Sequence, residues 1–394
     1  MLENFTRRQK INYFLILFGA GFHFLVLAYF WHLPRFVLSI GGNESDFGLI
    51  LGMTAFPIFL FSPVSGYLSD RISPKILILS GIFLAAGSSF AFLLIERISI
   101  WIYILRILQG LGHAFVFAPA LGLLSKMIPE KNKAEGLGYF AVAIQSANTV
   151  GSLLASRMLD KGVFVFFTTA ALSGAVSWIL MSFVKIEKEE KKAEIHRDEK
   201  KSWLNTVLQK KFLSGYILIL FLGGMFGTVL QFLPAFFDSL YQKNEISNPL
   251  HSSFFLTTAM ALIALSRVFL GKMTDRVDKV KITRINFVFL SISVFLISLI
   301  YNPLSAVGIA LFFGASYGLL YPVLNALVLM RSDIKDRGKV SGVLTMLFDT
   351  GFSAFAFLNG MLVFHYGYKL MFSALAGLMV LGFFIFTFLE RKKA

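Results

Sequence analysis

Apolar runs of about 20 residues recur along the whole chain, and no other feature limits its possible folds as much. That length is what an α-helix needs to cross the hydrocarbon core of a bilayer. The chain of 394 residues is 56% hydrophobic and only 15% charged. A soluble domain exposes far more charge than this. The sequence therefore predicts an all-α protein with many membrane spans.

We predict twelve spans. They cover 12–38, 47–68, 76–95, 100–126, 134–158, 163–184, 212–238, 251–271, 282–300, 304–330, 338–362 and 367–389. The first run is longer than a signal-peptide core and is interpreted as a retained span. Most of the 37 Lys and Arg residues fall in the termini and after even-numbered spans. Short cytoplasmic loops carry such an excess, so both termini are predicted to be cytoplasmic.

The net charge of +15 is therefore a topology signal. A nucleic-acid partner is not expected, because the cations are dispersed over many short loops and form no single patch. The chain has no cysteine, so disulfides and thiolate chemistry are excluded. We find no phosphate-binding loop and no metal-binding cluster, so no cofactor, no metal and no enzymatic activity are expected.

A short polar turn occurs twice. Residues 66–75 read GYLSDRISPK, and residues 271–280 read GKMTDRVDKV, with Gly, a small hydroxyl residue, Asp and Arg at the same spacing. A copy at half the chain length indicates two similar halves. The only long polar segment, 185–211, divides the chain into a six-span bundle at 1–184 and another at 212–394. Internal repeats of this kind are typical of secondary transporters.

The whole chain resembles the major facilitator superfamily. Residues 66–71 are similar to the front of its loop signature, whereas Ser73 and Pro74 depart from the rest. Residues 106–112, RILQGLG, resemble the signature of span 4, which is commonest in proton-coupled exporters. The proline-containing signature of span 5 in those exporters has no counterpart here. The resemblance implies two pseudo-symmetric six-helix bundles, alternating access and a central cavity between the halves.

Span 4 carries a polar face. Arg106, Gln109, Gly110 and His113 lie at i, i+3, i+4 and i+7, which places them on one side of a helix. An ionisable group deep in a membrane is costly and is a functional hypothesis by default. Arg106 could hold an anionic group or pair with a proton-binding carboxylate. The structural alternatives are that Arg106 snorkels and that His113 is a packed side chain.

Asp349 in span 11 is the only carboxylate that we place at mid-membrane. It could load and release a proton during a transport cycle, or it could be permanently paired with a cation. His23 in span 1 lies at similar depth and is a further candidate for solute binding or proton coupling, with core packing as the structural alternative. Gln145 and Asn148 on span 5 could contact a solute, although interhelical hydrogen bonds would explain them nearly as well.

The charged residues of the repeated turn form a predicted inner latch. Asp70 and Arg71, with Asp275 and Arg276, face the cytoplasm in the predicted topology. Each Asp could accept hydrogen bonds from a helix N-terminus when the cavity faces outwards. The alternative is that these residues only anchor the topology.

These features predict a monomeric transporter in the cytoplasmic membrane. Its partners would be a small organic solute (anionic, zwitterionic or amphipathic), protons and lipid. Proton-coupled export is the first hypothesis, and proton-coupled uptake of an organic anion is the alternative. A non-transporting receptor or scaffold on the same fold remains a more distant one. The sequence does not identify the solute.

Overall fold

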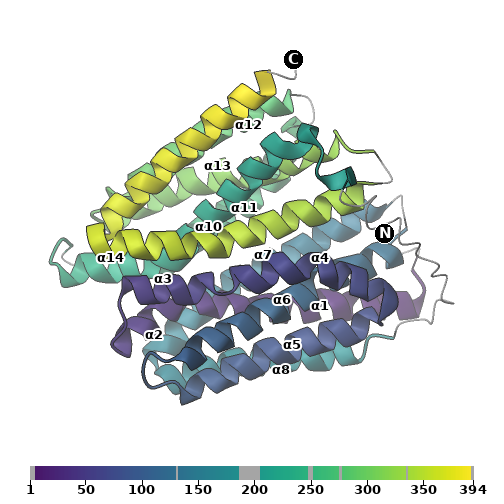
Figure 1. The fold of residues 1–394 in the computed structure, drawn as a ribbon, viewed down its shortest axis with the longest axis horizontal. Coiled ribbons are helices and arrows are strands. Elements are labelled where there is room, and N and C mark those ends of the chain that lie inside the picture. The colour runs from purple at the N-terminus through teal and green to yellow at the C-terminus, as the bar shows by residue number, and fades with distance from the viewer. Residues whose placement is uncertain are drawn as a thin grey trace. The chain divides into compact units, whose positions relative to one another are not determined.

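The computed structural model describes residues 5–129, 132–185, 205–246, 252–274, 277–333 and 336–391 (Figure 1). Within these ranges, side chains 67, 70, 71, 133–135, 253, 267–274 and 338 are left out. No strand occurs in the described ranges, and the predicted all-α class is confirmed. The elements are α1 (Arg7–Tyr29), η2 (Phe30–His32), α2 (Leu33–Ser39), α3 (Glu44–Gly52), α4 (Ala55–Arg71), α5 (Pro74–Ala91), η3 (Phe92–Leu94), α6 (Ile100–Met127), α7 (Lys133–Asp160), α8 (Val163–Ser182), η5 (Lys210–Phe212), α10 (Leu213–Gln242), α11 (Ser252–Thr274), α12 (Lys279–Ile297), α13 (Pro303–Leu329) and α14 (Arg337–Arg391).

Nine helical stretches of the described chain are long and apolar enough to cross a membrane, and Phe254–Ser266 is a shorter apolar one. One of the nine, Lys339–Arg391, contains the predicted spans 11 and 12 on either side of Gly367. The helix α7 has sufficient length, but its row of polar side chains makes it less apolar than the nine. The count of twelve therefore remains a prediction.

Helix starts follow local sequence. Thr6 and Gln9 form a capping box ahead of α1, and Asn302 and Ser305 form another ahead of α13. Such residues satisfy backbone N–H groups that have no partner in the first turn. Asp278 accepts from the Val280 backbone N–H and begins α12 in the same way.

Two predicted spans are interrupted. The stretch predicted at 12–38 tightens into a 3₁₀ turn, η2, four residues before Pro34, and the stretch predicted at 47–68 breaks at Met53 and Thr54, ahead of Pro57. A proline cannot donate to the carbonyl four residues earlier, so Phe30 and Met53 lose that helical bond.

The chain divides by its internal contacts into an N-terminal unit, Met1–Gly42 with Met53–Glu194, and a C-terminal unit, Asn43–Gly52 with Ile195–Ala394. In the N-terminal unit α1 packs on α7 and α8, α4 on α6, and α5 on α6 and α8. In the C-terminal unit α10 packs on α14, α11 on α13, and α12 on α13 and α14. The order of predicted spans is the same in both sets, so the duplication extends to the packing.

The short helix α3 belongs to the C-terminal unit, although it precedes α4 in the chain. It packs on α14, where a Cβ added at Gly48 would lie 2.5 Å from the Gly360 Cα. Phe47 packs on Phe232 of α10, with ring centroids 5.1 Å apart. The glycine pair lets the two helix backbones touch.

The duplication also appears in backbone conformation. Positive φ angles occur in the described chain at Gly41, Gly162, Asn244 and Gly367. Gly41 and Asn244 follow the first long helical stretch of each unit, and Gly162 and Gly367 separate the last two predicted spans of each. The matching turns lie about half a chain apart, as expected for two copies of one unit.

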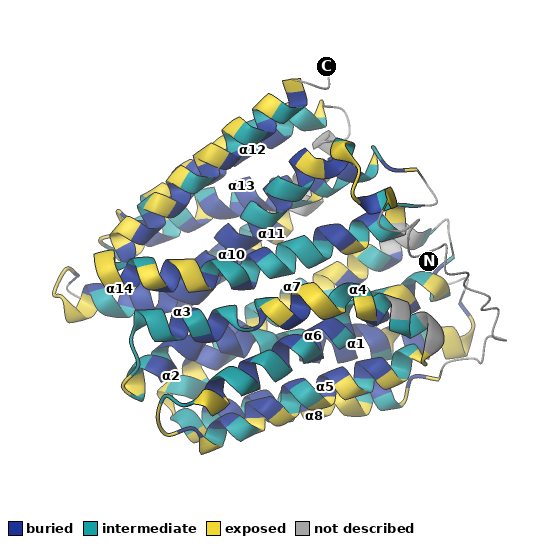
Figure 2. Cartoon of the chain, in the orientation of Figure 1, coloured by how far each residue is buried: buried dark blue, intermediate teal, exposed yellow. Residues whose placement is uncertain are grey.

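Exposed residues lie along several helices (Figure 2), and many of them are large and apolar. On α5 they are Ile76, Phe83 and Phe90, seven residues apart and therefore on one face. The helices α8 and α12 carry similar sets. In contrast, α1, α6 and α10 contribute most of the buried polar groups considered below.

Candidate functional site

The helix α6 carries the polar face predicted for span 4, and two glycines on α6 allow close packing. A Cβ at Gly110 would lie 2.7 Å from the Thr54 carbonyl oxygen, beside α4. A Cβ at Gly112 would lie 2.6 Å from the Gly81 carbonyl oxygen of α5. The two glycines of the RILQGLG segment thus have a steric role, since only a missing side chain permits these approaches. In the C-terminal unit Gly314 makes the same kind of approach to Ala259 of α11.

Arg106 is buried and begins a chain of hydrogen bonds. Its Nη1 donates to Gln109 Oε1 at 2.6 Å, and Gln109 Nε2 donates to Ser89 Oγ of α5 at 3.4 Å. The Ser89 hydroxyl donates to the Ala85 carbonyl. The guanidinium also lies 5.4 Å from the centre of the Phe30 ring, within range of a cation–π contact. The arrangement keeps Arg106 inside the bundle, which argues against the snorkelling alternative.

His23 of α1 and His113 of α6 lie face to face. Their ring centroids are 5.8 Å apart and their planes differ by 4°. Phe24 meets both imidazoles edge to face, and Phe117 stacks on His113 at 5.8 Å. His23 is fully buried, and neither of its ring nitrogens has a hydrogen-bond partner among the described residues. An unsatisfied buried polar group is costly, so this imidazole is poorly explained as packing alone.

The polar face predicted on α7 is half-buried at Gln145 and Asn148. The Asn148 Oδ1 atom is buried without a hydrogen-bond partner in the described chain. One turn further on, Ser152 lies 3.2 Å from His32 Nε2, which ties α7 to the buried turn after α1. The face therefore combines one interhelical bond with an amide oxygen that is open to a partner.

Asp349 lies in the C-terminal unit, half-buried on α14. Its neighbour Phe348 lies 6.2 Å from Phe226 of α10 between ring centroids, and Phe226 stacks on Tyr317 of α13 at 4.2 Å. Asp349 thus follows, in sequence, a residue of an aromatic cluster, and it lies within α14 rather than at a helix end. The structure brings Arg106 to Gln109 and His23 to His113, and all four belong to the N-terminal unit.

A polar link between α10 and α14 was not predicted. Asn359 donates to Thr228 Oγ1 at 2.7 Å, and Thr228 donates to the Gly224 carbonyl. Gln231 Nε2 donates to the Phe352 carbonyl at 3.2 Å. The signal in the sequence is Asn359 itself, an amide in an apolar run, which usually marks an interhelical hydrogen bond.

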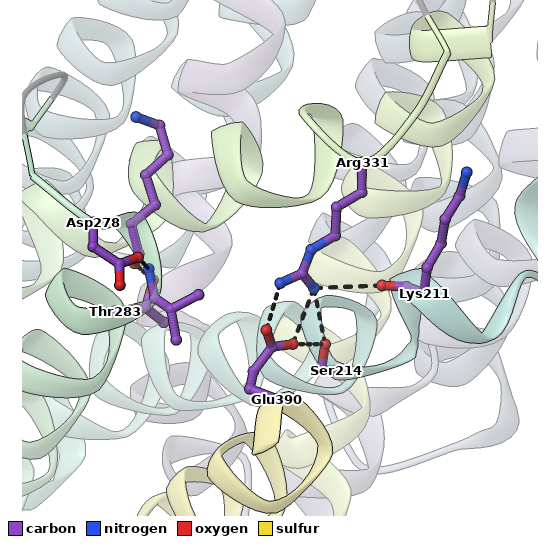
Figure 3. Close-up of polar contacts among 8 residues, drawn as sticks. Lys211, Ser214, Asp278, Thr283, Arg331 and Glu390 are labelled. Carbon is purple, nitrogen blue, oxygen red and sulfur yellow. Dashed lines mark hydrogen bonds and ion pairs between the residues drawn. The ribbon is translucent and has the colours of Figure 1, made fainter. Parts of the chain in front are cut away.

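A buried charge network at the end of the C-terminal unit was also missed (Figure 3). Arg331 Nη1 donates to Glu390 Oε1 at 3.0 Å and to Ser214 Oγ at 3.2 Å. Glu390 also accepts from Ser214, and Lys211 contributes its carbonyl to Arg331. The network joins the start of α10 to the ends of α13 and α14. In the N-terminal unit Asn12 joins α1 to the end of α8 by donating to the Lys185 carbonyl at 2.7 Å.

The predicted latch lies outside the described residues. The backbone of α4 includes Asp70 and Arg71, but their side chains are not described, and Asp275 and Arg276 are left out entirely. The latch stays a prediction. No group of three His, Cys, Asp or Glu side chains that could hold a metal ion occurs in the described part of the chain.

Comparison with known proteins places these features in a family. Quinolone resistance protein NorA of Staphylococcus aureus is 28% identical over 231 residues, which is 58% of this chain and 55% of NorA. The chain thus matches about half the length of that relative. Multidrug resistance protein MdtG of Escherichia coli is 24% identical over 375 residues, covering 92% of this chain and 89% of MdtG.

Solved structures show the same fold. Nucleoside transporter NupG superposes with a TM-score of 0.72 at 16% identity, covering 97% of this chain and 98% of NupG. A POT family transporter in complex with 5-aminolevulinic acid gives a TM-score of 0.79 at 13% identity, covering 98% and 96%. The relatives agree with the prediction that the chain is not an enzyme. The family model of the Major Facilitator Superfamily matches residues 11–355 and 249–394, and the chain therefore belongs to that superfamily.

Proposed function

We propose that this protein is a secondary active transporter that exports a small organic solute across the cytoplasmic membrane in exchange for protons. The solute is anionic, zwitterionic or amphipathic. The observation that carries the proposal is the buried chain from Arg106 through Gln109 to Ser89, on a helix whose glycines pack against α4 and α5. A guanidinium held inside an apolar bundle is a functional group by default, because burying it is costly. The resistance proteins NorA and MdtG support the export direction.

Asp349 and Arg106 have separate roles in the proposal. Asp349 binds and releases the coupling proton, since it is a half-buried carboxylate within a long apolar helix. Arg106 holds the anionic group of the solute, with Gln109 fixing its orientation. Gln145 and Asn148 add polar contacts to the solute, and the buried Asn148 Oδ1 supports this role.

The test uses purified protein in liposomes with an imposed pH gradient. A fluorescent quinolone is the first probe, because NorA is named for resistance to quinolones. We expect Asp349→Asn to abolish uphill movement of the probe while downhill exchange continues. Asp160→Asn is the matched control, because Asp160 is half-exposed in an ion pair with Arg35. Undiminished accumulation by Asp349→Asn would show that another group couples transport to protons.

Uptake of an organic anion with protons is the second candidate. The N-terminal unit favours it in one respect: Arg106, His23 and His113 are basic groups within its core. Flux of a labelled organic acid into right-side-out and inverted vesicles separates the two directions. Uptake predicts accumulation in right-side-out vesicles under an inward proton gradient, and export predicts the opposite.

The topology and the latch complete the proposal. Both termini lie in the cytoplasm, and the protein acts as a monomer in contact with lipid. Asp70 and Asp275 close the inner side of the cavity by accepting hydrogen bonds from helix N-termini, and Arg71 and Arg276 complete the latch. Cysteine labelling of the termini in intact cells tests the orientation, and the chain has no native cysteine to interfere.

A further inference from the structure

We propose that His23 and His113 together form one proton-binding site in the N-terminal unit, which holds at most a single proton. The inference rests on the proposed proton coupling for its role in transport, but proton binding itself can be measured without transport. It concerns two side chains that the span 4 signature does not explain, because His23 belongs to α1 and His113 follows the signature.

The geometry of the pair favours one proton. The imidazoles lie parallel with centroids 5.8 Å apart, so two protons would place like charges face to face inside the bundle. One proton gives a cationic ring stacked on a neutral ring. Phe117 stacks on His113 with ring centroids 5.8 Å apart, in the range at which the face of an aromatic ring attracts a cation.

The imidazole of His23 has hydrogen-bonding and proton-accepting nitrogens that the described chain does not use. A neutral imidazole has one donor nitrogen and one acceptor nitrogen. Both nitrogens of His23 lack a hydrogen-bond partner in the described chain, and the side chain has no exposed surface. The proton comes from water and adds to the lone pair of the acceptor nitrogen. No other bond forms or breaks.

The helices α1, α5, α6 and α8 contain no acidic residue, and the described side chains of α4 and α7 include one carboxylate, Asp160 at the end of α7. Besides His113, α6 contributes Arg106, two turns away along the helix, and Lys126 in its last turn. On α7 there is no acidic or basic residue between Tyr139 and Arg157, and α8 has none between Val163 and Ser182. On α5 the only one is Lys75 at its start, and α1 has none other than His23 between Tyr13 and Tyr29. The helices α1, α5, α6 and α8 therefore supply no counter-ion that would hold a proton on the pair.

The test is nuclear magnetic resonance of protein in nanodiscs with isotope-labelled histidine rings. Signals are assigned by His→Phe substitution and followed between about pH 5 and pH 8, where histidine changes charge in proteins. We expect the His23 and His113 signals to move together, with a total uptake of one proton. In His113→Phe, which keeps an aromatic ring in the stack, the His23 midpoint should shift by about one pH unit.

The control is His365→Phe, because His365 is exposed on α14 in the other unit. That variant should leave both signals unchanged. If His113→Phe does not fold, the reciprocal variant His23→Phe makes the same measurement on His113. Two signals that titrate independently, or that do not move over this range, would overturn the proposal. The histidine titration does not depend on transport, and the effect of Asp349→Asn on export does not depend on the histidine titration. The two proposals can therefore fail separately.

Discussion

Gly162 and Gly367 both combine a positive φ with an extended ψ, at matching places in the two units. Gly162 has φ 119° and ψ 158°, and Gly367 has φ 81° and ψ 169°. Each follows the helix predicted as the fifth span of its unit and precedes the sixth. L-residues rarely adopt such angles, and glycine adopts them readily because it has no Cβ. In each unit the helices predicted as the fifth and sixth spans are therefore joined by a very short turn.

Alanine at either of these glycines should destabilise the protein. A Cβ at Gly162 or Gly367 meets no atom within 4 Å, so the cost comes from the backbone angle and not from crowding. We expect Gly162→Ala and Gly367→Ala each to lower stability by about 1–2 kcal/mol. Thermal unfolding in detergent measures the effect. Gly377→Ala is the control, because this helical glycine has open space, and it should be neutral or stabilising.

Gly110→Ala should also be destabilising, but for a steric reason. The added Cβ would lie 2.7 Å from the Thr54 carbonyl oxygen and 2.6 Å from a Pro57 ring carbon. Pushing α4 and α6 apart should cost about 1–3 kcal/mol. Gly122→Ala on the same helix provides the comparison, since no atom lies within 4 Å of its Cβ. Equal unfolding temperatures for the two variants would contradict the close contact of α4 with α6.

The Arg331–Glu390 network should stabilise the fold more than an exposed ion pair of the same unit does. Glu390 is 6% exposed and Arg331 19%, whereas Lys369 and Glu245 are 54% and 37% exposed. Removing one partner leaves the other charge buried, so Glu390→Ala should lower stability by about 3 kcal/mol. Glu245→Ala should cost less than about 1 kcal/mol. Both are measured by unfolding, and similar losses would show that burial of Glu390 is not maintained.

The hydrogen bond between Asn359 and Thr228 can be measured by a double-mutant cycle. Asn359→Leu, Thr228→Val and the double variant remove the 2.7 Å bond between α14 and α10 one partner at a time. We expect a coupling energy of about 0.6 kcal/mol, the usual value for such bonds in membrane helices. A coupling energy near zero would mean that the two side chains act independently. Thr387→Val on α14 is the control, because the buried Thr387 hydroxyl has no hydrogen-bond partner in the described chain. It measures the effect of removing a hydroxyl that makes no such bond.

The features that sequence analysis predicted are local ones. Span length depends on the run of apolar residues, and the repeat is visible in 66–75 and 271–280, so both needed only the chain itself. Arg106 and Gln109 were predicted together because they are three residues apart on one helix. The bond between them follows from that spacing.

The features that were missed depend on how helices rotate against one another. The stack of His23 on His113 joins α1 to α6, and no spacing within one span predicts it. Glu390 lies one residue beyond the predicted span 367–389, and its partner Arg331 is 59 residues away in sequence. The grouping of α3 with the C-terminal unit likewise depends on the contact of Gly48 with Gly360.

Gly110 of α6 contacts α4, and Gly314 of α13 contacts α11. These two contacts limit how the helices can move. Where two helix backbones touch, neither can slide past the other without a clash of main-chain atoms, which yield far less than side chains. The pair α4 and α6, and the pair α11 and α13, should therefore each move as one rigid body during any transport cycle. Any bending that the cycle requires must then occur in the other helices of each unit.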